Sequence, residues 1–93
     1  MNTKRYVLLE VDGDVTPDDW EEFFVRLEQR FGKLRQIPVR GNGRVIVVKT
    51  NNRVAPTIRE EVPYMRAGSR RVRTVLTSGS IGKLKRLAAD GVA

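Results

Sequence analysis

The sequence predicts an α+β domain in which two helices cover one face of a four-stranded antiparallel sheet. Two observations lead to this prediction. Segments with the two-residue period of strands alternate with segments that have the 3.6-residue period of helices. Glycine or asparagine stands at each boundary between these segments, where the chain must turn. A length of 93 residues is typical of one domain, so residues 1–93 are treated as a single unit.

The first strand and the first helix have the clearest signals. Residues 4–11, KRYVLLEV, combine β-branched and aromatic residues, as strands do. Thr16 is a suitable N-cap, Pro17 suits the first helical position, and Gly32 ends the helical pattern. The helix between them carries a narrow apolar stripe, which consists of Trp20, Phe23, Phe24, Leu27 and Phe31.

Two strands are predicted on either side of Gly41-Asn42-Gly43, which tolerates the backbone of a hairpin turn. Residues 44–50 are apolar on both faces, as expected for a central strand. Residues 33–40 contain Pro38, which cannot donate to a strand ladder, so this strand belongs at an edge of the sheet.

The last third of the chain predicts a helix, a strand and a final helix. The helical pattern after Asn52 should kink or end near Pro63. In residues 70–77, Arg71 and Arg73 alternate with a second row, which consists of Val72, Thr74 and Leu76. A helix is expected over residues 80–90. The resulting β-α-β-β-α-β-α order fits a ferredoxin-like arrangement, as in RNA-recognition domains, with an added C-terminal helix.

The charge is unevenly distributed along the chain. Residues 1–28 hold eight acids and three bases, whereas residues 29–93 hold fifteen bases and three acids. Thirteen of the 18 bases are arginine, which suits bidentate contacts to phosphate. This clustering favours a polyanionic partner, most plausibly nucleic acid, over a role in solubility alone.

The composition argues against an enzyme. The chain has no cysteine and no histidine, so it lacks the thiolate nucleophile and the commonest general base. Catalysis by a carboxylate or a lysine stays possible, but this composition makes an enzyme the less favoured class. Asp12 and Asp14 have a spacing that can hold magnesium, but a turn before a helix explains them more simply, and no metal site is expected. Charges interrupt the N-terminal apolar run, which predicts no membrane contact and a cytoplasmic location.

One face of the predicted sheet is left open by the two helices. If alternate residues of the first strand face the helices, Tyr6 and Leu8 point outward, together with Val45 and Val47. Because only Tyr6 could stack on a base there, these four residues are predicted to bind a protein partner. The alternative that the last helix folds over part of this face stays open.

The segment TSGSIGKLKRL, residues 77–87, is the strongest functional signal. Its glycine spacing does not fit a P-loop, and Leu84 stands where a magnesium-binding hydroxyl is needed. It instead predicts a capped helix with free N–H groups at its start and bases on one side. The predicted RNA-binding residues are Arg70, Arg71, Arg73, Ser78, Gly79, Ser80, Lys83, Lys85 and Arg86.

The same segment resembles the V-S-G-T-I-K-x-L-K-R motif of the archaeal ribonuclease P protein component 2 family. Residues 4–11 are similar to the K-x-R-Y strand that opens that family, and the order of elements agrees across residues 4–88. Gly82 departs from the pattern, because the family usually carries lysine or arginine there.

The resemblance implies a non-catalytic protein subunit of ribonuclease P, the endoribonuclease that removes the 5′ leader of precursor tRNA. It implies binding to the catalytic RNA and precursor tRNA, with magnesium held by the RNA and not by the protein. It also implies a larger protein partner of barrel fold, and leaves open a homodimer within the complex. The residues alone leave two other functions open. One is a free-standing ferredoxin-like interaction or regulatory domain with no RNA role, and the other, which is less favoured, is a small nuclease that uses Asp12 and Asp14.

Overall fold

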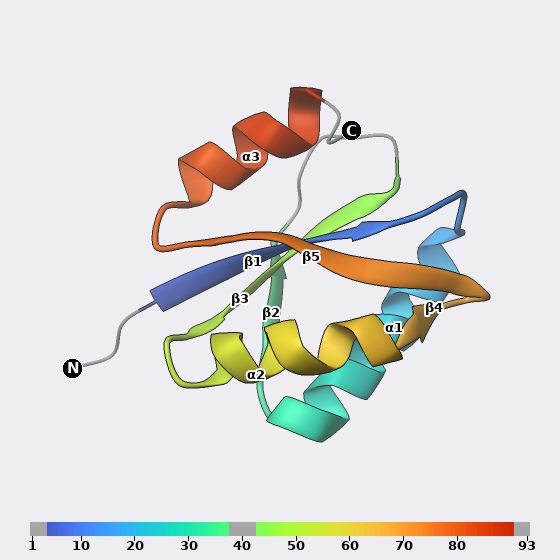
Figure 1. Ribbon diagram of the computed structural model, residues 1–93, viewed down its shortest axis with the longest axis horizontal. Helices are drawn as coiled ribbons and strands as arrows, with labels where there is room; N and C mark the ends of the chain where they lie inside the picture. Colours follow the sequence, from blue (N-terminus) through green and yellow to red (C-terminus); the bar gives the residue numbers. More distant parts are fainter. Residues whose placement is uncertain (1–3, 38–42, 91–93) are drawn as a thin grey trace.

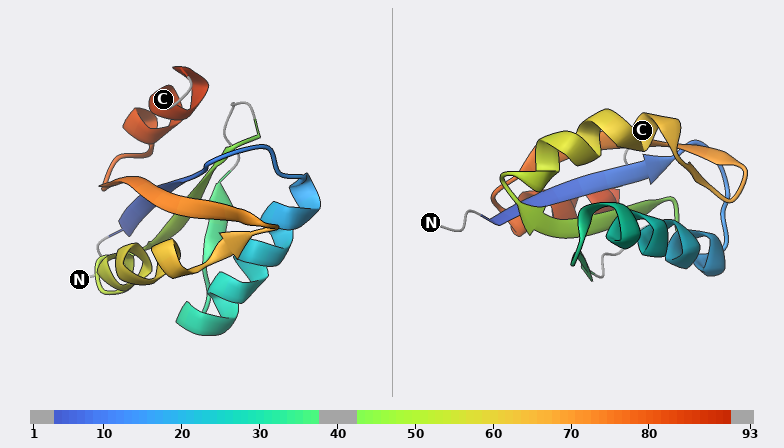
Figure 2. Two further views of the ribbon diagram at one scale, coloured as in Figure 1. Left: turned by 45° about the vertical axis from the view of Figure 1, so that its right-hand side comes forward. Right: turned by 90° about the horizontal axis from the view of Figure 1, so that it is seen from below.

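The computed structural model describes residues 4–37 and 43–90 and has an α+β architecture with three layers (Figure 1). The elements in chain order are β1 (Lys4–Val11), α1 (Pro17–Phe31), β2 (Arg35–Ile37), β3 (Val45–Asn51), α2 (Val54–Glu61), η1 (Val62–Tyr64), β4 (Arg66–Ala67), β5 (Arg70–Ser78) and α3 (Ile81–Asp90). The strands pair antiparallel in the order β2-β3-β1-β5-β4. Helices α1 and α2 lie side by side on one face, and α3 lies on the other (Figures 1 and 2).

Helix α1 forms where the sequence predicts it. Thr16 Oγ1 accepts a hydrogen bond from the backbone N–H of Asp19 at 3.1 Å, and Asp19 Oδ2 accepts one from Thr16 N at 3.0 Å. This reciprocal capping box satisfies two N–H groups that a helix start leaves without partners. Gly32 ends the helix with a φ of 84°, which a side chain would disfavour. Trp20, Phe23 and Leu27 are buried, as the apolar stripe requires.

The main core lies between the sheet and α1 with α2. Val7, Leu9 and Val11 of β1 face this core, so alternate residues of the strand point toward the helices as predicted. Trp20 of α1 donates from Nε1 to the carbonyl of Gly43 at 2.7 Å, which gives its one polar atom a partner. The edge position of β2 is also confirmed, whereas Pro38, Gly41 and Asn42 of the predicted hairpin lie outside the described residues.

A β-bulge changes which residues of β5 face each side. Leu9 pairs with Thr74 and Leu8 pairs with Leu76, so Val75 is an extra residue in β5. The prediction that Leu76 lies on the same side as Val72 is therefore wrong, because Val72 packs with the main core and Leu76 with the opposite face. A period-two pattern cannot show where an extra residue enters a strand.

The described residues form five strands, where the sequence predicts four. The helical segment changes to a 3₁₀ turn at Val62 and ends before Met65, in agreement with the break expected at Pro63. The chain then forms the short strand β4, which pairs with β5 through a tight turn at Gly68. Gly68 has a φ of 60°, which side chains disfavour, and an ideal Cβ there would lie 2.9 Å from the Asp19 carboxylate. The turn therefore requires glycine for two reasons, its backbone conformation and the lack of space for a side chain.

Candidate nucleic-acid interface

The start of α3 is built by the end of β5 and the beginning of β1. Ser78 Oγ accepts a hydrogen bond from the backbone N–H of Ser80 at 3.0 Å, which turns the chain before α3 begins at Ile81. Tyr6 pairs with Ser78, so the first residues of β1 lie beside this turn. An ideal Cβ on Gly79 would lie 3.3 Å from Arg5 Nη1. The guanidinium of Arg5 thus approaches the turn closely.

Helix α3 is amphipathic, and the sheet holds its apolar side. Leu84 is fully buried and Ile81 is half-buried in a second cluster of apolar side chains. Lys83, Lys85 and Arg86 are exposed. The first N–H groups of a helix lack partners within it and attract anions. The exposed cations and the helix start therefore favour contact with phosphate.

Further cations lie at the same end of the sheet. The lining of a pocket of about 570 Å³ includes four bases, which are Lys4, Lys33, Arg35 and Lys49. Glu28 is the acidic residue in the same lining. Arg35 of β2 and Lys49 of β3 are direct cross-strand partners, an arrangement of like charges that destabilises a sheet unless an anion compensates it. We refer to Lys4, Arg5, Lys33, Arg35, Lys49 and the start of α3 at residues 79–83 as the basic end.

Three of the predicted RNA-binding residues lie along β5, outside the basic end. They are Arg70, Arg71 and Arg73. Arg70 and Ser78 stand at opposite ends of β5, roughly 26 Å apart at the rise of an extended strand. Arg73 Nε donates to Glu10 Oε1 at 2.8 Å, and Glu10 neutralises much of its charge. Arg70 packs against Gly13 and lies near Asp14. The structure therefore places Arg70 at the far end of β5 from the start of α3, and it pairs Arg73 with an acid.

The loop after β1 holds an ion pair. Asp14 Oδ1 accepts hydrogen bonds from Arg44 Nε at 3.1 Å and Arg44 Nη2 at 2.8 Å. This hydrogen bonding, and then the charge of Arg44, hold the pKa of Asp14 below its ordinary value of 3.8. Within the described ranges, no group of three or more acidic side chains is placed to hold a metal ion. Asp14 of the D-x-D pair instead faces Arg44.

The four residues predicted to bind a protein partner lie beneath α3. Leu8, Val45 and Val47 are buried with Leu84, and Tyr6 is half-buried against the same cluster. Helix α3 folds over this face of the sheet, which is the alternative that the sequence left open. A partner could reach Leu8 and Val47 only after α3 moved away.

The sequence reasoning missed five cations of the basic end. They are Lys4, Arg5, Lys33, Arg35 and Lys49. They are scattered along the first half of the chain and meet because β1 and β3 are antiparallel, with Lys4 opposite Asn51. In any antiparallel pairing of these two strands, the beginning of β1 lies beside the end of β3. The bases at these two strand ends could therefore have been predicted to lie close together.

No protein-family model matches the chain, and no curated protein is significantly similar to it. Over residues 4–37 and 43–90, none of the helices has both the length and the apolar composition needed to cross a bilayer.

Proposed function

We propose that the chain is a non-catalytic, RNA-binding protein subunit of ribonuclease P, which stabilises the catalytic RNA that removes the 5′ leader of precursor tRNA. The observation that carries the proposal is the basic end. There, the start of α3, in the segment that resembles the ribonuclease P family, lies at the same end of the sheet as cations from β1, β2 and β3. Cations from several elements around an open helix start suit the backbone of a structured RNA.

We further propose that the fold is a ferredoxin-like domain with two additions. The strand order β2-β3-β1-β5, with α1 and α2 on one face, supports this assignment. The additions are the edge strand β4 and the helix α3. Because α3 occupies the sheet face on which RNA-recognition domains stack bases, RNA contacts in this chain fall to the end of the sheet and to α3 itself.

The contact with a larger protein subunit is best placed on the outer side of α1. Asp18, Glu21 and Glu22 are exposed there and give this side a negative charge. Val25 is 45% exposed on the same helix. An acidic surface with an apolar residue suits a basic protein partner and repels RNA, so it separates the two kinds of contact.

The test is a titration of the catalytic RNA of ribonuclease P against the protein over a range of salt. The triple variant Lys83→Ala/Lys85→Ala/Arg86→Ala should reduce the slope of log affinity against log salt by about 2 to 3, because each lost phosphate contact removes about 1. An unrelated structured RNA of equal length measures the binding that does not depend on sequence. Leader removal by the catalytic RNA at low magnesium should also increase when the protein is added.

Arg59→Ala is the control for the triple variant, because Arg59 is also an exposed cation on a helix but belongs to α2. It should leave the salt slope unchanged. If the triple variant kept the wild-type slope, or if the protein did not promote leader removal, the proposal would be wrong. Weak binding to every RNA would instead favour a free-standing interaction domain.

A further inference from the structure

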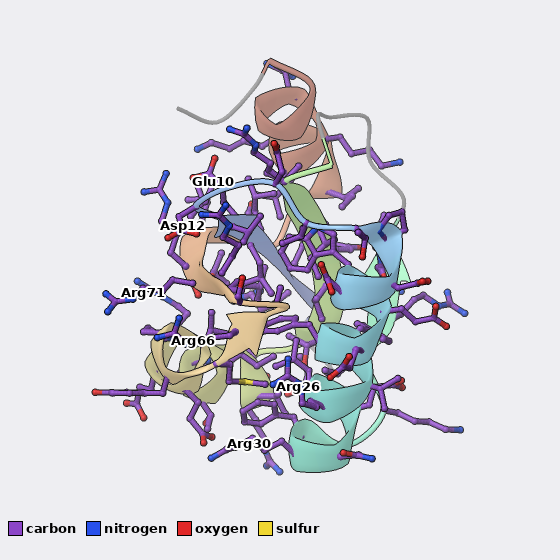
Figure 3. The ribbon with its side chains drawn as sticks, turned by 90° about the vertical axis from the view of Figure 1, so that its right-hand side faces the viewer. Glu10, Asp12, Arg26, Arg30, Arg66 and Arg71 are labelled. Atoms are coloured by element: carbon purple, nitrogen blue, oxygen red, sulfur yellow. The ribbon has the colours of Figure 1, made fainter. Side chains whose placement is uncertain are left out.

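A row of arginines runs from α1 to the hairpin that β4 and β5 form, at a distance from α3. Arg26 and Arg30 are one turn apart on α1, and Arg26 Nη2 donates to the carbonyl of Arg66 in β4. Arg66 is the direct cross-strand partner of Arg71 in β5. Figure 3 shows the four side chains in this order, from the end of α1 to the β4–β5 hairpin. We call Arg30, Arg26, Arg66 and Arg71 the arginine row.

The row borders a pocket of about 600 Å³ between α1 and the segment from η1 to β4. Its lining consists of Arg26, Gln29, Arg30, Tyr64, Met65, Arg66 and Gly68. No carboxylate is part of this lining. Tyr64 stands at the rim and is 89% exposed, so nothing in the described chain covers its ring. The other exposed large hydrophobic side chain of the described residues, Val25, is only 45% exposed.

The charges of the row are only partly compensated within the described residues. Arg26 Nε is shielded from solvent and has no hydrogen-bond partner there. Arg30 pairs with Glu61 at 2.6 Å, but this is a single, partly exposed pair, and a guanidinium has five N–H donors. Like charges one helical turn apart, as Arg26 and Arg30 are, destabilise a helix. The same is true of like charges directly opposite in a sheet, as Arg66 and Arg71 are. An anion bound along the row would relieve both repulsions.

We propose that this pocket and the arginine row form a second RNA-binding surface, which holds single-stranded RNA with phosphates on the arginines and a base stacked on Tyr64. Guanidinium groups bind phosphate oxygens in pairs, and an exposed aromatic ring accepts any base. A stretch of acidic protein would use the arginines but would leave Tyr64 without a role. The proposal deepens the proposed function, on which it rests for the biological partner.

Two separate RNA surfaces have a consequence for assembly. The bases of α3 lie on one face of the sheet, whereas Arg26 and Arg30 of the row belong to α1, which covers the other (Figures 1 and 3). One RNA segment at the basic end and α3 and another at the row can be bound at the same time. The protein then holds two segments of one folded RNA at a fixed separation, which is how a subunit without catalytic residues stabilises a catalytic RNA.

The test uses the full chain and an eight-nucleotide oligouridine labelled for fluorescence anisotropy. Tyr64→Ala should weaken binding by about 5-fold to 150-fold, the range expected for loss of one base stack. Tyr64→Phe should bind like the wild type because it keeps the ring. Arg66→Gln should reduce the salt slope by about 0.7, the loss of one phosphate contact to a single strand. Arg59→Gln, a matched change at an exposed position of α2 that belongs to neither RNA surface, should leave the slope unaltered.

The outcomes separate this proposal from the proposed function, because oligouridine contains no element of ribonuclease P RNA. Wild-type affinity in Tyr64→Ala and an unchanged slope in Arg66→Gln would overturn the second surface while leaving the basic end untouched. Equal binding of an abasic oligomer would overturn the stacking on Tyr64. An octaglutamate peptide provides a competitor for the row. If this peptide displaced the oligonucleotide at equal concentration, and Tyr64→Ala changed the binding of neither the peptide nor the oligonucleotide, the row would be assigned to an acidic protein instead. Circular dichroism confirms that each variant is folded.

Discussion

Asp14 is the acid whose ionisation the fold changes most clearly. Its carboxylate accepts two hydrogen bonds from Arg44, and these keep the pKa of Asp14 below 3.8. A carboxyl group with a lowered pKa in the folded state stabilises the protein above its unfolded pKa and loses this effect as the pH falls through the folded pKa. NMR titration should therefore place the pKa of Asp14 below 3.8, and Arg44→Gln should return it toward that value.

The same pair predicts a difference in acid stability. Below about pH 4, the wild type should lose stability more steeply than Asp14→Asn, because the variant has no carboxyl group to protonate at this position. Urea unfolding at several pH values measures the difference. Equal pH dependence in the two proteins, or an ordinary pKa for Asp14 beside an intact Arg44, would show that the ion pair does not form in solution.

Single residues also show why part of the site could be predicted. Ser78, Gly79 and Lys83 are neighbours in sequence, so their pattern was sufficient to place them at one helix start. Arg73 was assigned to RNA because it lies on the strand that leads into the basic last helix, but its charge is paired with Glu10, 63 residues earlier. No local pattern shows such a partner, because it depends on the register between β1 and β5.

At the scale of the element, α3 contains a glycine that its environment does not require. An ideal Cβ on Gly82 would meet only Ser80 Oγ, at 4.0 Å. Gly82→Ala should therefore stabilise the protein by about 0.5 to 1 kcal/mol, because glycine loses more backbone entropy in a helix than alanine does. Gly82→Lys should add a phosphate contact as well and raise the affinity for structured RNA.

Urea unfolding measures the first effect, and the salt dependence of RNA binding measures the second. Gly79→Ala is the contrasting substitution, because a Cβ there would crowd Arg5 Nη1 at 3.3 Å. Gly79→Ala should weaken RNA binding with little effect on stability. Gly82→Ala should raise stability with little effect on RNA binding. Destabilisation by Gly82→Ala would show that the start of α3 needs the glycine after all.

The elements that could be predicted are those whose signals are local. The Thr16–Asp19 capping box, the stop at Gly32 and the break at Pro63 depend on residues within one turn of each other. Strand β4 has two residues, which is too short for a period to be visible, and the bulge at Val75 appears only in the pairing with β1. Both errors concern relations between strands, and a sequence pattern does not contain these relations.

At the scale of the whole molecule, α3 closes a second core on the sheet face that the sequence left open. Leu84 packs against Leu8, Val45 and Val47, all of them buried. The order of layers could not be predicted because α3 follows the last strand, and the sequence does not say which way it turns. This arrangement makes the sheet two-sided, with one apolar cluster under each layer of helices.

Leu84 is the residue on which the docking of α3 depends most. Leu84→Ala should destabilise the protein by about 2 to 4 kcal/mol, the usual cost of removing a buried leucine side chain. Since α3 lies apart from the core around Trp20, the loss should begin as undocking of α3. Hydrogen exchange should therefore accelerate in α3 before it does in α1, and Trp20 fluorescence should stay native at urea concentrations where α3 is already open.

Undocking would also uncover the apolar face of the sheet, so Leu84→Ala should bind more of a hydrophobic dye than the wild type. Val25→Ala is the matched control, because it removes an apolar side chain that is already 45% exposed and should change neither dye binding nor exchange. If α3 and α1 exchanged together in Leu84→Ala, the two cores would unfold as one unit. A protein partner would then gain access to Leu8 and Val47 only at the cost of the whole fold, which would leave the outer side of α1 as the place for its contact.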